Sequence, residues 1–211
     1  MGGKITIIGC GPGAPDLITV RGKEALERAE VIVGSKRLIT KFAGEENALR
    51  IPLDGNYKKV MERVETLLEK KDVAFLVSGD PLFHSFGESV IKKFGHERCE
   101  VIPGISAFQH AFSRLKESWK GYGLFSLHGN GSLDIKKVFE DNNRFVLLLD
   151  PKHNLKYVAK KIRPLSGRNY TFHVASNLSL EGESISKITF EDFATFGETS
   201  LSILIVRRDN D

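Results

Sequence analysis

The strongest constraint on the fold of this chain is an apolar run that ends in a turn. Val73 to Val77 reads VAFLV, which predicts a buried strand. The residues that follow, Ser78 to Phe83, read SGDPLF, and Ser-Gly-Asp-Pro is typical of a turn. Open α/β sheets bind ligands at the carboxyl ends of their strands, so Gly79 and Asp80 stand where a ligand would meet the backbone. An ordinary strand-to-helix loop explains this stretch equally well when it is taken by itself.

Composition places the 211 residues among soluble globular proteins, with one large or two small domains. The formal net charge of +4 suits a small polycarboxylate better than nucleic acid, because no nucleic-acid motif is visible and the paired lysines fall in helical patterns. No apolar run is long enough to span a bilayer. Cys10 and Cys99 form no CxxC pattern and the histidines lack ligand spacing, so we expect no disulfide, no bound metal and a cytoplasmic location.

The first glycine-rich loop raises the alternative of a dinucleotide site. Gly9, Gly11 and Ala14 satisfy the loose fingerprint after a short β-rich run. In that motif the helix must start inside the glycines, but Pro12 and Pro15 remove backbone donors and keep the chain extended. A better helix start is Thr19, as N-cap of a helix over residues 20–29. The pattern therefore predicts a proline-stiffened loop that lines a cleft without cradling phosphate.

Strands and helices alternate through the first half, which predicts an α/β fold with a mostly parallel sheet. A third glycine-bearing loop, Pro103 to Ala107, follows the strand at residues 100–102 and opens a helix that runs through Leu115. Ser106 is placed to cap that helix or to donate to a ligand. The three loops follow strands of one sheet, so we expect them to gather on one edge. The other expected elements are helices at 36–42, 57–70 and 88–94 and a strand at 48–53.

The second half predicts another α/β domain after a linker at residues 116–123. Its expected strands lie at residues 124–127, 145–150, 170–175 and 201–206, with a further segment at 185–190 and helices through 139 and over 154–163. The last strand is crowded with aliphatic residues and should lie inside the second sheet. His128 ends a strand, where a histidine is either a hydrogen-bonding residue or an acid or base. The expected domains are residues 1–117 and 118–211.

The three loops, GCGPGAPDLIT, SGDPLF and PGISAF, together resemble the tetrapyrrole methylase family, which uses S-adenosylmethionine. Gln109, Ala111, Arg114, Leu115 and Trp119, the SLHG segment that contains His128, and Asn177-Leu178 followed by Glu183 are similar to the subfamily that methylates carbon 5 of the corrin precursor cobalt-precorrin-7. The resemblance implies two α/β domains, a mixed C-terminal sheet, a cleft between the domains and a homodimer. It also implies a separate partner enzyme for methylation and decarboxylation at carbon 15, because the chain is too short to include that domain.

The resemblance also implies the residues of the site. By motif position, the cofactor contacts are Pro12, Ser78, Gly79, Asp80, Phe83, Ser106, Ala107 and Leu149. Asp16, His84 and His128 are the candidates to accept a proton if one must leave the ring system. Arg21, Lys36 and Arg37 are the candidates to meet the carboxylates of the substrate.

The sequence departs from the subfamily pattern at Ser176, at Asn130 and at His84-Ser85. Three alternatives therefore stay open. One is a methylase of the same family that acts at another ring carbon or on a modified histidine of a translation factor. Another is a nicotinamide-dependent oxidoreductase that uses the loop at residues 9–14. The third is a non-catalytic binding module with a degenerate site.

Overall fold

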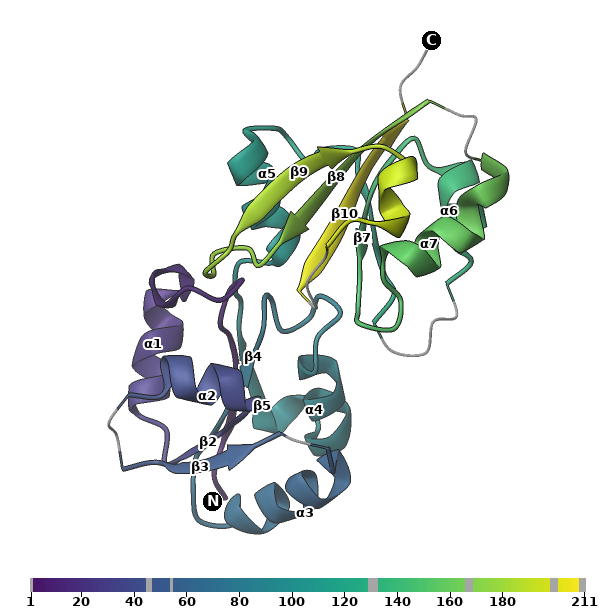
Figure 1. Cartoon of the computed structure of the whole chain (residues 1–211). Coiled ribbons are helices and arrows are strands. Elements are labelled where there is room, and N and C mark those ends of the chain that lie inside the picture. The colour runs from purple at the N-terminus through teal and green to yellow at the C-terminus, as the bar shows by residue number, and fades with distance from the viewer. Residues whose placement is uncertain are drawn as a thin grey trace. The chain divides into compact units, whose positions relative to one another are not determined.

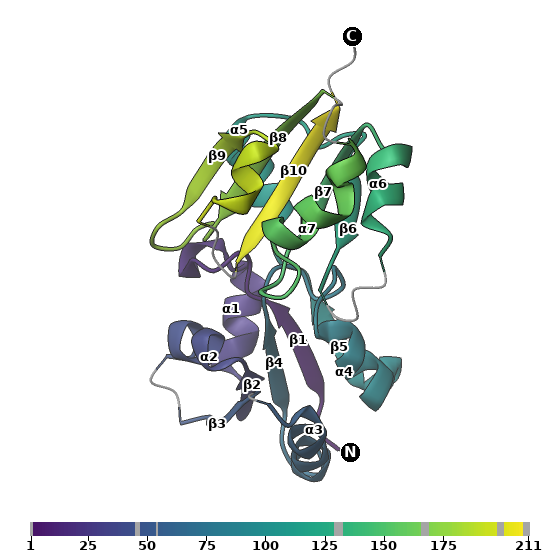
Figure 2. The same cartoon turned by 45° about the vertical axis from the view of Figure 1, so that its right-hand side comes forward.

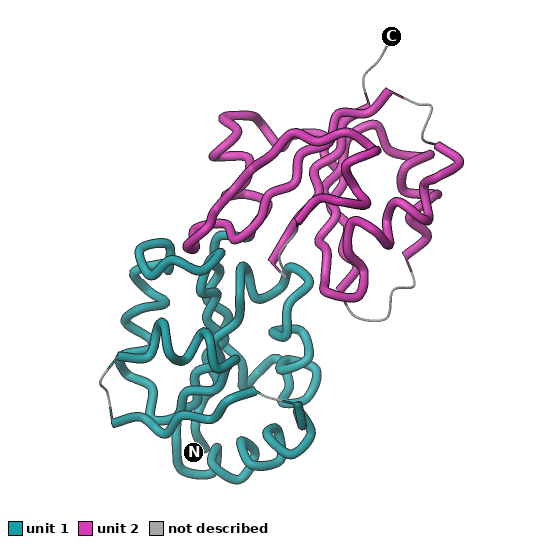
Figure 3. The backbone as a smooth tube through the Cα atoms, in the orientation of Figure 1, with its two compact units in different colours: residues 1–106 teal, residues 107–211 magenta. Residues whose placement is uncertain are grey.

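The computed structural model describes residues 2–44, 47–53, 55–128, 133–165, 169–197 and 201–208. The chain divides into two compact units, residues 1–106 and 107–211 (Figure 3). The sequence places the boundary later, after residue 117. The helix that follows Ser106 belongs to the second unit, because its Phe112 ring packs at 4.7 Å against that of Tyr122 and its Arg114 pairs with Glu183.

The first unit is a five-stranded sheet in the order β3-β2-β4-β1-β5, and every pair of neighbouring strands is parallel (Figure 1). The predicted strand at residues 73–77 is β4, and all five of its residues are buried. The parallel sheet confirms the predicted fold class. The elements are β1 (Ile5–Gly9), η1 (Pro15–Leu17), α1 (Val20–Glu27), β2 (Val31–Gly34), α2 (Lys36–Phe42), β3 (Leu49–Pro52), α3 (Tyr57–Leu67), β4 (Val73–Val77), α4 (Gly87–Phe94), η2 (His96–Arg98) and β5 (Cys99–Ile102).

Side-chain caps fix where the helices of this unit begin. The Oγ1 of Thr19 accepts from the N–H of Gly22 at 3.0 Å, so α1 begins at Val20 as predicted. Ser35 and Asn56 cap α2 and α3 in the same way. Alternate strand residues then pack against two helical layers: α1 and α2 cover one face of the sheet, and α3 and α4 cover the other (Figures 1 and 2).

The second unit is a mixed sheet in the order β6-β7-β10-β8-β9, in which only β6 and β7 are parallel among the described strands. The last strand, β10, lies inside the sheet, which confirms its predicted place. The elements are α5 (Ala107–Leu115), β6 (Gly123–Ser126), α6 (Ile135–Asp141), β7 (Arg144–Leu148), α7 (Leu155–Ile162), η3 (Arg163–Leu165), β8 (Tyr170–Ser176), β9 (Ser184–Ile188), η4 (Glu191–Ala194) and β10 (Ser202–Arg208).

One face of this second sheet carries an aromatic core. The buried rings of Phe139, Phe145, Phe172 and Phe193 pack there with apolar residues of α6 and α7, while α5 lies on the other side of the sheet (Figures 1 and 2). Each unit therefore has a core of its own. Within the described ranges, no helix combines the length and the apolar character needed to cross a membrane.

Candidate functional site at the carboxyl edge of the parallel sheet

Three glycines bring the three predicted loops into backbone contact. β1 lies between β4 and β5, so Gly9, which ends β1, has as neighbours Gly79 and Gly104, which lie in the loops after β4 and β5. A Cβ built on Gly104 would lie 2.3 Å from the carbonyl oxygen of Gly79, and one built on Gly9 would lie 2.6 Å from the nitrogen of Gly104. No side chain fits at either position. The prediction that the loops gather on one edge is confirmed.

Hydrogen bonds tie these loops to one another. The N–H of Gly79 donates to the carbonyl of Gly11 at 2.8 Å, and both glycines have positive φ, 66° and 68°. Asp80 accepts from the N–H of Leu82 at 2.9 Å through Oδ1 and from the N–H of Gly104 at 3.3 Å through Oδ2. The carboxylate of Asp80 therefore joins the second loop to the third. Each oxygen keeps further lone pairs with which to accept from a ligand.

Ser78 and Arg37 form a contact between β4 and the start of α2. Nη2 of Arg37 donates to Oγ of Ser78 at 2.8 Å, so the serine hydroxyl hydrogen is left to donate elsewhere. Burial raises the pKa of the neighbouring Cys10 thiol to about 12, against smaller opposing effects of a backbone hydrogen bond from Val77 and the charge of Arg37. Cys10 is therefore neutral near pH 7 and contributes no negative charge here.

The remaining predicted cofactor contacts lie in or beside these loops, except for one. Pro12 is half-buried between Gly11 and Gly13, and the ring of Phe83 lies 4.9 Å from that of His84. Ser106 is 1% exposed and ends the first unit, while Ala107 opens α5. The other contact is Leu149, which follows β7 in the second unit.

The three candidate proton acceptors do not form one cluster within a unit. Asp16 is exposed in η1, and His84 is exposed in the loop after Phe83 with a φ of 49°, which is strained for a residue other than glycine. His128 belongs to the second unit, where its Nε2 donates to the carbonyl of Leu149 at 2.7 Å. One ring nitrogen of His128 is therefore committed to holding the backbone after β7.

The carboxyl end of β7 carries a pair that the sequence analysis missed. Oδ2 of Asp150 accepts from Nδ1 of His153 at 2.9 Å, and its Oδ1 accepts from the N–H groups of Lys152 and His153. Burial would raise the pKa of Asp150, but these hydrogen bonds outweigh it and lower the pKa. The sequence does contain a signal for this pair: Asp150 stands three positions before His153, just after an apolar strand.

A second missed cluster joins α5 to the connection between β8 and β9. Glu183 accepts from Nε2 of His110 at 3.1 Å, from Nε of Arg114 at 2.7 Å and from the backbone N–H of Ser179. Burial would raise the pKa of Glu183, yet the hydrogen bonds and the charge of Arg114 lower it. Ser176, one of the departures from the subfamily pattern, is buried and shares a 2.7 Å hydrogen bond with Ser202. Asn130 lies outside the described residues.

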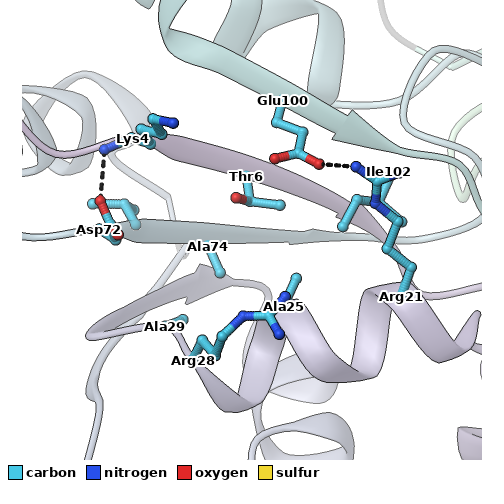
Figure 4. Close-up of a pocket in the computed structure, with 11 residues that line it drawn as sticks. Lys4, Thr6, Arg21, Ala25, Arg28, Ala29, Asp72, Ala74, Glu100 and Ile102 are labelled. Carbon is cyan, nitrogen blue, oxygen red and sulfur yellow. Dashed lines mark hydrogen bonds and ion pairs between the residues drawn. The ribbon is translucent and has the colours of Figure 1, made fainter.

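A pocket of about 310 Å³ lies elsewhere, between α1 and the parallel sheet (Figure 4). It follows the helix-facing side of the strands from their amino ends, where Lys4 and Asp72 lie, toward the start of α1, where Arg21 pairs with Glu100 at 2.6 Å (Figure 4). Of the predicted site residues in the described part of the chain, Arg21 alone lines it. Its lining residues are Lys4, Thr6, Arg21, Ala25, Arg28, Ala29, Asp72, Val73, Ala74, Glu100 and Ile102. Among the described residues, no group of three or more His, Cys, Asp or Glu side chains is placed to hold a metal ion.

Comparison with known proteins gives a consistent result. Residues 4–194 match the family described as Tetrapyrrole (Corrin/Porphyrin) Methylases. A relative in Methanocaldococcus jannaschii, named probable cobalt-precorrin-7 C(5)-methyltransferase, is 30% identical over 220 residues, which cover 98% of this chain and 99% of the relative.

Two solved structures share the fold. The precorrin-6Y methylase of Archaeoglobus fulgidus superimposes with a TM-score of 0.75 at 24% identity, over 98% of this chain and 99% of the other. The uroporphyrin-III C-methyltransferase of Thermus thermophilus, solved with S-adenosyl homocysteine, gives a TM-score of 0.79 at 18% identity, over 97% of this chain and 92% of the other.

Proposed function

Because this chain belongs to the tetrapyrrole (corrin/porphyrin) methylases, we propose that it is an S-adenosylmethionine-dependent methyltransferase that methylates carbon 5 of cobalt-precorrin-7 in cobalamin biosynthesis. The substrate comes from the name of the M. jannaschii relative, with which the chain aligns over almost its whole length. The observation that best supports S-adenosylmethionine as the cofactor is that three glycine-bearing loops meet at one edge of the sheet.

The residues at this edge fit the chemistry of the methyl donor. Asp80 offers carboxylate lone pairs for ribose hydroxyls or an ammonium group, and the Ser78 hydroxyl is free to donate its hydrogen. Gly79, which has no side chain and a φ of 66°, lets a ligand approach the backbone. Pro12, Phe83 and Ser106 complete the contacts proposed for the first unit, and Ala107 and Leu149 are the proposed contacts of the second unit.

The main work of the chain is to position its ligands. When bound, S-adenosylmethionine supplies an electrophilic methyl group on a sulfonium. An electron-rich ring carbon attacks such a group with little acid or base help, so good alignment is worth up to about 7–11 kcal/mol. Rigid loops serve this purpose, and the contacts among Gly9, Gly79 and Gly104 make these loops rigid. Asp16 or His84 is the proposed acceptor in the first unit if a proton leaves the ring, since both are exposed.

The dinucleotide alternative is disfavoured by where the first helix begins. A pyrophosphate site needs a helix that starts within the glycine loop. Here Pro15–Leu17 forms a 3-10 turn and α1 begins at Val20, well after Gly11. A nicotinamide cofactor would therefore lack the helix N-terminus that normally receives its phosphates.

Equilibrium calorimetry tests the cofactor. We expect S-adenosylhomocysteine to release heat on binding, and NAD and NADP to give none. Asp80→Ala should abolish S-adenosylhomocysteine binding, because it removes a ligand acceptor and also frees the third loop from the second. The control Glu62→Ala removes an exposed acid from α3 and should bind as the wild type does. An unchanged affinity in Asp80→Ala would contradict the placement of the cofactor.

The ring carbon is tested by incubating the enzyme with cobalt-precorrin-7 and ¹³C-methyl donor and locating the label by NMR. Label at carbon 5 supports the proposal, and label at another meso or pyrrole carbon assigns a sister activity. We also propose a cytoplasmic enzyme, since Cys10 and Cys99 are free thiols. A homodimer and a separate carbon-15 methyltransferase and decarboxylase complete the proposal by resemblance to the family.

A further inference from the structure

Arg37 is the one described residue whose buried side-chain polar group lacks a partner. Its Nη1 is buried and has no hydrogen-bond acceptor, and no other buried side-chain nitrogen or oxygen in the described ranges shares that condition. Native proteins pair nearly all such atoms, so each exception needs a reason. A donor kept for a ligand is one such reason.

Among the residues that the structure describes, no acidic side chain pairs with Arg37. Two other arginines of the described part pair with acids: Arg21 with Glu100 at 2.6 Å and Arg114 with Glu183 at 2.7 Å. No such ion pair reaches Arg37 in the described residues, and its one electrostatic neighbour is the buried thiol of Cys10, which is neutral near pH 7. Burial accordingly lowers the pKa of Arg37. An anion beside the partly buried guanidinium of Arg37 would supply both an acceptor for Nη1 and the opposite charge.

The fold holds this guanidinium beside the candidate site. Arg37 lies in the first turn of α2, directly after β2, and the buried side chains of Leu38 and Ile39 fix that helix to the sheet. Its Nη2 donates to Oγ of Ser78, the first residue of the second loop.

We propose that Arg37 binds a carboxylate of a ligand at this edge, either the amino-acid carboxylate of the methyl donor or a side-chain carboxylate of the tetrapyrrole. The inference rests on the proposed function. A planar guanidinium offers neighbouring N–H groups that match the two oxygens of a carboxylate. Such a ligand gives Nη1 its acceptor and Arg37 its missing counter-charge, while Ser78 keeps the group oriented.

Binding to four probes tests this assignment in Arg37→Gln and Arg37→Lys. S-adenosylhomocysteine carries the amino-acid carboxylate, and methylthioadenosine is the matching thioether without it. Cobyrinic acid is a corrin with free carboxylates, and its fully amidated form lacks them. We expect Arg37→Gln to weaken one carboxylate probe by about tenfold to a hundredfold and to leave its matched neutral probe unchanged. Loss with S-adenosylhomocysteine identifies the donor's carboxylate, and loss with cobyrinic acid identifies the substrate's.

Arg63→Gln is the control, since it removes the same charge from an exposed position on α3. Thermal melting gives an independent readout: Arg37→Gln should melt at or above the wild-type temperature, because it removes a partly buried charge that has no acidic partner among the described residues. If Arg37→Gln does not fold, Arg37→Lys serves in its place. It keeps the positive charge but lacks the paired N–H groups of the guanidinium, so it should weaken binding of the carboxylate probe and leave binding of its matched neutral probe unchanged.

Two results would overturn the assignment: equal affinity of Arg37→Gln and wild type for both carboxylate probes, or an equal loss for carboxylate and neutral probes with a lower melting temperature. The second result would make Arg37 a structural tie to Ser78. If the wild type itself binds neither S-adenosylhomocysteine nor cobyrinic acid, the proposed function fails and the role of Arg37 falls with it. A wild type that binds while Arg37→Gln is unaffected sinks only the role of Arg37.

Discussion

At the scale of single residues, the candidate site depends on side chains that are absent as much as on those that are present. Gly9, Gly79 and Gly104 allow three backbone segments to touch, and the carboxylate of Asp80 then spans from its own loop to the N–H of Gly104. Because buried backbone groups need partners, this contact also satisfies a donor that the close packing would otherwise isolate. The carboxylate of Asp80 thus both fixes the shape of the loops and provides acceptors for a ligand.

Replacing Gly104 by alanine tests this packing. Its Cβ would lie 2.3 Å from the carbonyl of Gly79, a backbone atom that cannot rotate away, so the loops must separate. We expect Gly104→Ala to lower the free energy of unfolding by about 1–3 kcal/mol and to weaken S-adenosylhomocysteine binding. Urea unfolding and calorimetry measure the two effects.

Gly197→Ala is the matched control, because nothing lies within 4 Å of a Cβ built there. It should change neither stability nor affinity appreciably. A Gly104→Ala variant with wild-type affinity would show that the loops can separate without harm to the site.

At the scale of elements, ion pairs and hydrogen bonds of Glu183 join α5 to the connection from β8 to β9. The connection contains non-glycine residues with positive φ, Asn177 at 51° and Ser179 at 61°. Such backbone conformations are costly and persist where neighbouring contacts impose them. Glu183 supplies those contacts by accepting from Ser179 within the turn and from His110 and Arg114 on α5.

The lowered pKa of Glu183 predicts a pH dependence of stability. Because the folded state prefers the charged carboxylate, its contribution is present above the ordinary carboxyl pKa of 4.5 and is lost as the pH falls through the lower folded value. Glu183→Gln should cost about 1–2 kcal/mol at pH 7 and show a shallower loss of stability below pH 4.5. Urea unfolding across this range measures both.

Part of the acid dependence should remain in Glu183→Gln, since the pKa of Asp150 is lowered as well. Asp150→Asn therefore serves as a comparison, and the double variant should lose more of the slope than either single one. An acid slope in Glu183→Gln equal to that of the wild type would contradict a stabilising role for the charged carboxylate.

Elements whose signals are local were predictable from the sequence. Periodicity and turn residues place β4 at residues 73–77 and α2 at residues 36–42 with the bounds observed, and the hydroxyl of Thr19 marks the start of α1. The predicted helix at 57–70 ends earlier, at Leu67, because Leu68 is its C-cap and the N–H groups of Glu69 and Lys70 then donate to carbonyls three residues back, at Thr66 and Leu67, in place of regular α-helical bonds.

Contacts between distant residues were beyond reach of the sequence. Arg37 and Ser78 are 41 positions apart and Asp80 and Gly104 are 24 apart, and no periodicity encodes which polar side chain reaches from one loop of the sheet edge to another. Family resemblance supplied Asp80 as a ligand contact but not its bond to Gly104. The same limit explains the later boundary predicted for the first domain, since the partners of α5, Tyr122 and Glu183, follow it in the sequence.

At the scale of the whole molecule, two independent cores stabilise two compact units, and ligand binding adds to that stability by mass action. At a concentration of one hundred times its dissociation constant, a ligand that binds only the folded state adds about 2.7 kcal/mol. This gain is concentrated where the ligand contacts the backbone. Local opening there becomes rarer, and amide hydrogens exchange more slowly.

Hydrogen exchange with saturating S-adenosylhomocysteine therefore maps the site over the whole chain. We expect slower exchange at residues 10–13 without Pro12, at residues 79–83 without Pro81, and at residues 104–107, because these loops form the carboxyl edge of the sheet. The residues that line the pocket beside α1, such as Arg28 and Asp72, should exchange as in the free protein, and α3 provides an internal reference. Protection of the α1 pocket with unchanged exchange in the three loops would move the cofactor away from the glycine-bearing edge, because a ligand in direct contact with those loops must reduce their local opening.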